Sequence, residues 1–599
     1  MTRIIKIFYS AAAFAMLSSA VSAQNLHQSV EVTNVYEGKV MEVNKMELPM
    51  NIPDSISTFD YKFDYSVFDN PYNGSYEFHP YLISMKPDPS PYSGKNLYFR
   101  AGAGYSFKPE AQLVFSPDQK KNFRFSLYDF FDGYGGDYKY LASDWMEYIK
   151  YGMLYNKDGK TFNGHEYSNR FGVNMRLDTD DVAFTFDADY HFISVRDTSY
   201  AEKWSYGNTN STINAFDAVL GFNSKNTDGV FYKGYLSGGF LRDDIKLNGS
   251  PFALGELKAS AKFDTGYNIG ESGMVDFDSG IDFYSYSMTL DAYSANLYII
   301  PHFTFEKGVF HLKAGVRASY LLSKDNGYPR GSFGQKKEMF RKKSQIFYPD
   351  VHVSFDVYKN HLQLYADLSG YERINDFSSL IERNRFFNPV FSKTYSCVME
   401  NMVVPFDVRA GIRGSLFDRL QFDFKASYTQ YQNYCNDAVY FEVRAVNPDL
   451  AGTPFFAYND LNIISAEATA SWKSEHVELE GGLILRKTDA DLDKVVGILD
   501  ANMEGGGSAM FNIAGRIFIG GSCYASTGRK GYNCPIMSDL STMDVKVPSF
   551  VNLGARAEFR FNGNFSVWAS GNNLLNNICG PYFLHPEGVS VTGGLCLNL

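Results

Sequence analysis

The sequence predicts an all-β fold, a single large antiparallel β-barrel of about 22 strands that crosses a membrane. Apolar and polar residues alternate along most of the chain, short polar turns interrupt the alternation at regular intervals, and aromatic residues are abundant. A sheet in lipid must satisfy its backbone groups internally, and closure into a barrel achieves this. The count follows from the turns, and about 20 to 24 strands would satisfy the same pattern.

The alternation is clearest in residues 182–192, where apolar side chains share one face and Thr, Asp and His share the other. The same pattern returns in residues 310–318 and 553–561. Successive side chains of a strand point to opposite faces, so these segments predict strands with one apolar and one charged face. A face with this many charges indicates contact with water. The apolar face is then expected to contact lipid.

Composition favours the same fold. The chain has 43 Tyr and 51 Phe but only 4 Trp. A membrane barrel places Phe against lipid and Tyr at both interfaces. The alternative is a large aromatic-rich sandwich or carbohydrate-binding array, which the length and the charged faces do not favour. The net charge of −11 argues against a nucleic-acid partner, because such proteins need basic surfaces.

The N-terminus predicts export to the outer membrane of a Gram-negative bacterium. Positive residues precede a short apolar run, and residues 21–23 (Val-Ser-Ala) form a cleavage site, so residues 1–23 are expected to be a signal peptide. Residues 24–94 are rich in Pro, Asp, Tyr and Phe and lack periodicity, which predicts a periplasmic extension or partial plug. The barrel is expected to occupy residues 95–599.

Short turns divide the predicted barrel into hairpins, each pair of strands being joined at the far end by a longer loop. The turn at Gly515 is the least regular, because the chain around it could continue as one long strand. Ten such turns, with both termini on their side of the membrane, give about 22 strands. The ten turns are Ser116–Lys121, Asp178–Asp181, Ser224–Gly229, Glu271–Gly273, Glu306–Gly308, Tyr358–His361, Phe417–Arg419, Lys473–His476, Gly515–Arg516 and Asn562–Asn564.

Longer loops are expected at the other end, at Asp132–Tyr167, Lys324–Lys343, Glu372–Asn401 and Asn433–Asp460. Their mixture of Tyr, Asn, Asp, Arg and Pro is typical of exposed binding surfaces. A barrel of this size is too wide for its own side chains to fill. We therefore expect residues 24–94, inward-folded long loops or a partner protein to occupy the lumen. The alternative for residues 24–94 is a disordered periplasmic tail.

Charged residues at alternate strand positions are predicted to line the lumen. They could guide a polar solute, or they could pair across strands and brace the barrel, which is the commoner role for any one of them. Asp276, Asp278 and Asp282 share one strand face and could bind a divalent cation, but the sequence gives no geometry, and we predict no metal. The predicted lining residues are Asp187, Asp189, Asp276, Asp278, Asp282, Lys313, Arg317, Asp423, Lys425, Arg556, Glu558 and Arg560.

Catalysis and cofactor binding are not predicted. The ten His residues are scattered, and neither G-x-S-x-G nor H-E-x-x-H occurs. Six Cys residues lie in the C-terminal third, and an exported protein can form disulfides. Cys523 and Cys534 flank a predicted outer loop, Tyr524–Asn533, and are the pair expected to form a disulfide. The cysteine spacing has no metal-site signature.

The end of the chain resembles the last hairpin of TonB-dependent receptors. Residues 570–577 (Ser-Gly-Asn-Asn-Leu-Leu-Asn-Asn) are followed by a loop with Pro586 and an alternating strand, Val589 to Leu599. In that family the penultimate strand commonly ends in an N-L-F-N/D-type sequence. The chain departs from the family by ending in Leu599 instead of an aromatic residue. It also departs at the front, where residues 24–94 are too few for the family's plug domain.

The resemblance implies an outer-membrane receptor-like barrel that binds and takes up a polar or oligomeric ligand. The missing plug favours an alternative, a plug-less accessory barrel subunit of an outer-membrane assembly or secretion machine. In that alternative residues 24–94 would dock a periplasmic protein or lipoprotein. An unassisted porin also fits a plug-less barrel, although porins normally use fewer strands. Expected partners are outer-membrane lipids, a polar solute and such a docked protein.

Overall fold

The computed structural model describes residues 96–599, apart from residues 118–121, 140–160, 198–208, 226–228, 248–249, 271, 289–291, 326–346, 359–360, 387–399, 417–418, 444–449, 475, 536–541 and 578–586. The predicted signal peptide and N-terminal extension lie outside the described residues. No helix in the described part of the chain is long and apolar enough to cross a membrane.

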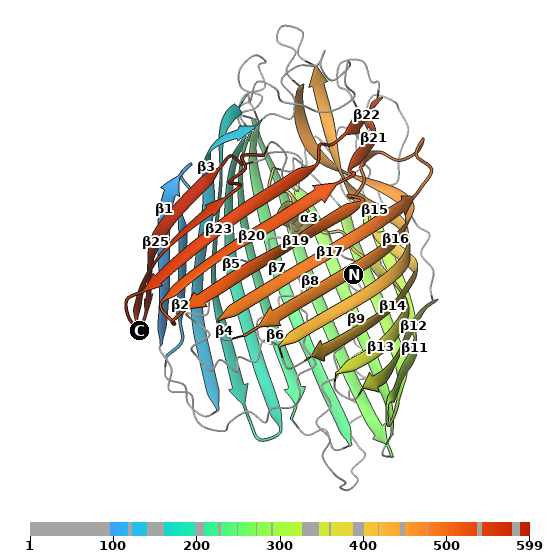
Figure 1. Cartoon of the computed structure of the whole chain (residues 1–599). Helices are drawn as coiled ribbons and strands as arrows, with labels where there is room; N and C mark the ends of the chain where they lie inside the picture. The colour runs from blue at the N-terminus through green and yellow to red at the C-terminus, as the bar shows by residue number, and fades with distance from the viewer. Residues whose placement is uncertain are drawn as a thin grey trace.

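Twenty-two antiparallel strands form a closed barrel (Figure 1). Consecutive wall strands pair with one another, and β25 pairs with β1 over Tyr98–Tyr105, so the sheet has no open edge. The predicted fold class and strand number are confirmed. The wall strands are β1 (Leu97–Tyr105), β2 (Glu110–Phe115), β3 (Phe123–Lys139), β4 (Thr161–Asp178), β5 (Val182–Asp197), β6 (Thr209–Ser224), β7 (Val230–Leu247), β8 (Ser250–Ile269), β9 (Gly273–Met288), β10 (Ala292–Lys307), β11 (Phe310–Asp325), β12 (Phe347–Tyr358), β13 (Leu362–Arg373), β14 (Met402–Leu416), β15 (Leu420–Val443), β16 (Leu450–Lys473), β17 (Val477–Asp489), β19 (Met503–Ile513), β20 (Ile517–Thr527), β23 (Phe550–Arg560), β24 (Phe565–Asn572) and β25 (Ser590–Asn598).

The short connections fall at one end of the barrel, at all ten predicted positions. The turn at Gly515 is confirmed: β19 ends at Ile513, and Ala514 and Gly515 have φ values of 54° and 69° before β20 begins. The Asn512 side chain accepts a hydrogen bond from the Gly515 N–H at 2.9 Å. Two successive residues in the left-handed region reverse the chain, which is why the strand does not continue.

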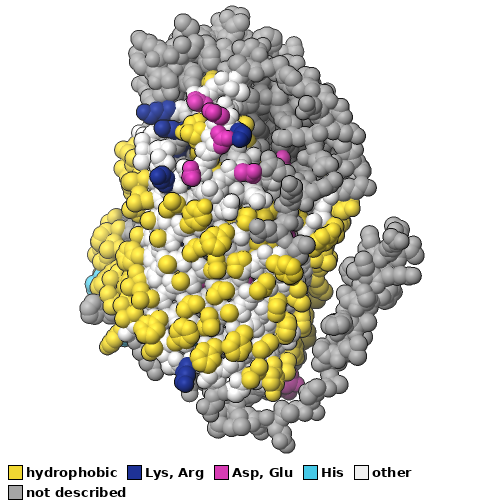
Figure 2. Space-filling view, turned by 90° about the vertical axis from the view of Figure 1, so that its right-hand side faces the viewer, with side chains coloured by type: hydrophobic (Ala, Val, Ile, Leu, Met, Phe, Trp, Pro, Cys, Tyr) yellow, Lys and Arg dark blue, Asp and Glu magenta, His cyan; other side chains and the backbone are white. Residues whose placement is uncertain are grey.

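The outward face of the wall is apolar and exposed. Phe184, Leu236, Phe263 and Ile519 are each at least 40% exposed, although their strand neighbours point to the charged inner face. Figure 2 shows hydrophobic side chains spread over the wall, with most of the visible charged side chains gathered toward one end. A contiguous apolar surface of this extent would be unfavourable in water. It is the surface of a barrel that spans a membrane.

The wall is much taller on one side than on the other. β15 and β16 are 24 residues long, whereas β1 and β25, which close the barrel, are 9 residues long. The predicted loop Asn433–Asp460 is therefore wrong, because most of it is strand. The register shifts between Tyr431 and Tyr434, where Asn433 has a φ of 57°, and pairing then resumes toward Val443. A β-bulge bends a strand without ending it, so the alternation breaks while the strand continues.

Three short strands and one helix are not part of the wall, and they lie toward the end of the barrel opposite the short turns. β18 (Gly497–Ile498) pairs with β15 and with β21 (Lys530–Pro535), and β21 pairs with β22 (Thr542–Lys546). The helix, α3 (Phe377–Arg383), is the only one in the described ranges. We call this end the mouth of the barrel.

Candidate functional site at the barrel mouth

The predicted lining residues lie on the inward face of the wall but are distributed around it. Each occupies a strand position between outward-facing neighbours, and all twelve have partners on the wall or with one another. Most of the pairs join different strands and so brace the wall, whereas Glu558 contacts Arg556 and Arg560 within β23. The structure does not gather the twelve residues into one site. The partners are Asn174 for Asp187, Arg170 for Asp189 (3.0 Å), Lys313 for Asp276 (3.1 Å) and Asp278 (4.0 Å), Ser260 for Asp282 (2.5 Å), the Tyr298 ring for Arg317 (4.1 Å), Tyr365 for Asp423 (2.8 Å), Glu467 for Lys425 (2.9 Å), and Glu558 for Arg556 (4.0 Å) and Arg560 (3.1 Å).

A histidine takes the place of Asp282 in the group of three aspartates that could bind a divalent cation. Ligand atoms of Asp276, Asp278 and His302 lie within 4.8 Å of one another, whereas Asp282 hydrogen-bonds elsewhere. The Lys313 ammonium lies 3.1 Å from Asp276, and His302 Nδ1 lies 3.2 Å from the same carboxylate. The lysine thus occupies the position beside the carboxylates that a cation would take. His302 is missed by sequence reasoning because only the pairing of β9 with β10 places it opposite Asp276.

The predicted disulfide between Cys523 and Cys534 is wrong, because both are free cysteines. β20 runs on to Thr527, so Cys523 lies within a wall strand, where its side chain is exposed on the outward face. Cys534 is buried in the small sheet at the mouth, where burial raises the pKa of its thiol to about 12. The predicted loop Tyr524–Asn533 therefore does not begin at Tyr524, because β20 continues to Thr527.

The first part of the connection from β13 to β14, residues 374–386, folds into the mouth. We call residues 374–386 the bridge. Its helix α3 begins after Asp376, whose Oδ1 accepts a hydrogen bond from the Ser379 N–H at 2.6 Å. Phe377, Leu380 and Ile381 follow at helical spacing, so their apolar side chains share one face. The helix ends at Arg383, and Asn384 caps it by donating its N–H to the Leu380 carbonyl.

The apolar face of α3 packs against two separate parts of the wall. Phe377, Leu380 and Ile381 are almost fully buried in one cluster with residues of β5 to β10 and with residues of β15 and β16. Burying such side chains contributes roughly 1.5 to 3 kcal/mol each. The bridge therefore extends from its own strands to other sectors of the wall. Burial of its apolar side chains stabilises it in that position.

Hydrogen bonds anchor the two stems of the bridge. Before it, the Glu372 carboxylate accepts from Ser319 Oγ at 2.6 Å and from the Tyr348 hydroxyl at 3.0 Å. After the connection, Asn401 Nδ2 donates to Ser294 Oγ at 2.8 Å. These residues are buried, which makes an unpaired polar atom among them costly. The stems are therefore fixed to β10, β11 and β12.

Two buried contacts hold the helix itself. The Glu256 carboxylate on β8 accepts hydrogen bonds from the Phe377 N–H and the Ser378 hydroxyl, each at 2.5 Å. At the other end of α3, Arg383 Nε lies 3.2 Å from Asp437 on β15, and both side chains are less than a tenth exposed. Charged groups at this depth need such partners, because an unpaired buried charge is strongly unfavourable.

The last contact of the bridge is more exposed. Arg385 Nη1 lies 2.6 Å from Glu166 on β4, and the two side chains are 23% and 17% exposed. Asp132 on β3 lies 3.8 Å from the same nitrogen. Phe386 packs edge-on against Tyr138, with ring centroids 5.3 Å apart. The bridge thus ends against β3 and β4, on the same side of the barrel as the seam between β25 and β1.

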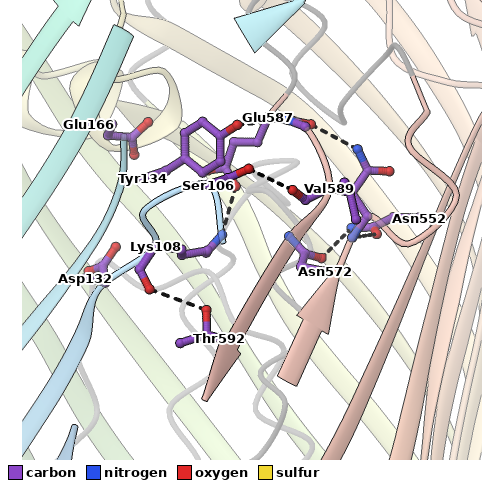
Figure 3. A network of polar contacts seen from close by, with 12 residues as sticks. Ser106, Lys108, Asp132, Tyr134, Glu166, Asn552, Asn572, Glu587, Val589 and Thr592 are labelled. Atoms are coloured by element: carbon purple, nitrogen blue, oxygen red, sulfur yellow. Dashed lines mark hydrogen bonds and ion pairs between the residues drawn. The ribbon is translucent and has the colours of Figure 1, made fainter. Parts of the chain in front are cut away.

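A polar network joins the first and last strands at this seam (Figure 3). Ser106 Oγ donates to the Val589 carbonyl at 3.0 Å, and Lys108 Nζ lies 2.8 Å from Glu587. Thr592 Oγ1 donates to the Lys108 carbonyl at 3.3 Å. The network attaches the β1–β2 turn to the segment before β25. Ion pairs and hydrogen bonds therefore supplement the backbone pairing of the closing strands.

Sequence reasoning missed the bridge as a site. The loop Glu372–Asn401 was predicted, and inward-folded loops were one of three expected occupants of the lumen. The local signal was present, since Asp376 precedes apolar residues at i, i+3 and i+4 spacing. The wall partners have no comparable signal, because Glu256 and Glu166 lie more than a hundred residues from the groups that they bind.

Comparisons with known proteins show the fold. No protein-family model and no curated protein matches the sequence. Solved structures do match: the copper transporter OprC has a TM-score of 0.58 at 11% identity, covering 85% of this chain and 82% of its own. The iron transporter FrpB from Neisseria meningitidis has a TM-score of 0.58 at 10% identity, covering 84% and 81%. The alcaligin outer-membrane receptor FauA from Bordetella pertussis has a TM-score of 0.54 at 12% identity, covering 85% and 76%.

These structures are TonB-dependent receptors, and the chain has their 22-strand outer-membrane barrel fold. The resemblance seen in the last hairpin is thus confirmed at the level of the barrel. The similar proteins are transporters and receptors by name and not enzymes. The predicted absence of a full plug concerns residues 24–94, which lie outside the described part of the chain.

Proposed function

We propose that this chain is an outer-membrane receptor-like barrel that binds a polar or oligomeric ligand at its mouth and takes it across the membrane through its lumen. The observation that carries the proposal is the closed 22-strand wall, apolar outside and charged inside, with the bridge folded inward at its mouth. A barrel of this size has room for a solute or for a plugging element, which a narrow barrel lacks.

The inner surface favours a polar ligand. Carboxylates, guanidinium groups, hydroxyls and amides of the inward face form pairs between strands, as between Lys258 on β8 and Asp217 on β6 at 2.7 Å. Such a surface offers hydrogen-bond donors and acceptors to a hydrated solute. The names of the similar proteins include copper and iron transporters, but identities of 10% to 11% do not extend those ligands to this chain.

The remaining parts of the proposal concern the chain before β1. We propose that residues 1–23 direct export and that residues 24–94 act as a partial plug or dock a periplasmic protein or lipoprotein. The charges on the wall have structural partners, so we assign none of them to catalysis, to a metal or to a cofactor. The ligand contacts are proposed for the mouth, where the bridge and the small sheet of β18, β21 and β22 lie.

Copurification tests the proposed function. The tagged protein would be extracted from its native outer membrane in mild detergent, and the copurifying proteins would be identified by mass spectrometry. Recovery with TonB or with a solute-binding surface lipoprotein is the expected result and supports uptake. Recovery with assembly or secretion components would overturn the uptake proposal and support the accessory-subunit alternative. A matched untagged strain gives the background.

A further inference from the structure

We propose that the bridge is a gate across the barrel mouth, anchored at its stems and released from its Arg385 end. The inference rests on the proposed passage of a solute through the lumen and deepens it. It concerns residues 374–386 and the wall residues that they contact, all of which the structure describes. Its geometric basis is that consecutive parts of the bridge contact sectors of the wall that are distant from its own stems.

The bridge crosses the mouth instead of lining it. It leaves the wall at β13, and its contacts with Glu256 on β8, Asp437 on β15 and Glu166 on β4 follow within ten residues. A loop lying along its own strands would contact β12 to β15 alone. Because one short segment reaches β4, β8 and β15, a bulky solute that moves along the barrel axis meets it. The bridge is thus placed to limit passage.

The two ends of the bridge are held with unequal strength. Buried hydrogen bonds fix the stem at Glu372, and a buried ion pair joins Arg383 to Asp437. The pair of Arg385 with Glu166 is partly exposed to water. Exposed ion pairs are weak and screened by salt, whereas loss of one partner from a buried pair is strongly unfavourable. Release is therefore expected to begin at Arg385 and to proceed toward Arg383.

Conductance of the purified full chain in planar lipid bilayers tests the gate. Glu166→Gln keeps the size of the side chain but removes its charge, and it should raise the fraction of time spent open by up to about fivefold. Asp437→Asn removes the charged partner of the buried Arg383, and also of Arg529 at 3.9 Å, and should raise the open fraction by about a hundredfold, or to saturation. Higher salt should increase opening of the unmodified chain more than that of Glu166→Gln.

Matched controls remove ion pairs of similar exposure that do not contact the bridge. Asp178→Asn breaks the partly exposed pairs with Arg176 and Lys225 at the short-turn end, and Glu504→Gln breaks the buried pair with Arg486. Both should leave the open fraction at the unmodified level. Heat-modifiable mobility on denaturing gels shows for each variant whether the barrel is folded. A short bifunctional thiol reagent across Glu256→Cys and Ser378→Cys should hold the bridge closed, compared with the same variant before cross-linking.

The gate proposal is overturned if Glu166→Gln and Asp437→Asn, both folded, conduct like their controls. It is equally overturned if no variant conducts ions, because another element would then close the lumen. Copurification with TonB or a lipoprotein is unaffected by these outcomes, so the gate can fail while the proposed uptake function stands. The converse also holds, since a gated barrel that copurifies with assembly components would retain the gate and lose the uptake function.

Discussion

The two ends of the barrel are held by different kinds of contact. At the short-turn end the contacts are local: the Asn512 side chain accepts from the Gly515 N–H, three residues away. At the mouth they connect distant parts of the chain: Glu256 accepts from the Phe377 N–H, 121 residues away. The short-turn end is therefore complete once neighbouring strands pair. The mouth requires the whole barrel to exist before its contacts can form.

This difference predicts that the mouth is a separate unit of stability. The wall is a continuous ladder of backbone hydrogen bonds, whereas the bridge is held by one apolar cluster and a few polar contacts. Regions held by few contacts open at lower free energy than the structure as a whole. The bridge should therefore open while the strands remain paired, which is also what a gate requires.

Phe377→Ala should have the largest effect. The side chain is fully buried in the cluster that joins α3 to two parts of the wall, and its truncation costs about 3 to 5 kcal/mol. Hydrogen–deuterium exchange of peptides covering 374–386 should then accelerate on the order of a hundredfold or more, with the wall peptides unchanged. Phe184→Ala, on the lipid face, is the control and should leave exchange of the bridge unaltered. Uniform acceleration over wall and bridge would contradict their independence.

The same division separates what sequence could and could not predict. All ten short turns were found, because Asp, Asn and Gly mark tight reversals within a few residues. The alternation of apolar and polar residues also predicted which side chains point to lipid and which to the lumen, because this period of two does not depend on the neighbouring strand. The loop at Asn433–Asp460 was mistaken because a β-bulge at Asn433 breaks the alternation as a loop would.

Gly515→Ala should have the next largest effect, at the short-turn end. Gly515 has a φ of 69°, and nothing lies within 4 Å of a Cβ added there, so the cost is backbone strain alone, about 1 to 2 kcal/mol. The urea midpoint for unfolding from lipid vesicles should fall, while exchange of the bridge stays unchanged. Gly521→Ala is the control, since that glycine has ordinary strand geometry and room for a methyl group. If Gly521→Ala lost as much stability as Gly515→Ala, backbone strain at residue 515 would not be the cause of the loss.

The candidate site was less predictable than the fold because its members meet only through strand pairing. His302 joins Asp276 and Asp278 because β10 runs beside β9, a pairing that the order of residues alone does not reveal. The expected disulfide failed for a related reason: β20 carries Cys523 on the outward face, whereas Cys534 is buried in another sheet. The two cysteines are close in sequence but lie on different surfaces because they belong to two different strands, β20 and β21.

Lys108→Met should have the smallest effect, although its contact joins the first and last strands at the mouth. The pair with Glu587 is 31% and 22% exposed, and pairs of this kind contribute about 0 to 1 kcal/mol. Methionine keeps most of the length of the side chain, and the backbone carbonyl of residue 108 can still accept from Thr592. The urea midpoint should drop slightly at low salt and match the unmodified chain at high salt, where the charge interaction is screened. A salt-independent loss as large as that of Gly515→Ala would mean that this lysine braces the seam by packing, and that the mouth depends on exposed contacts more than its buried cluster indicates.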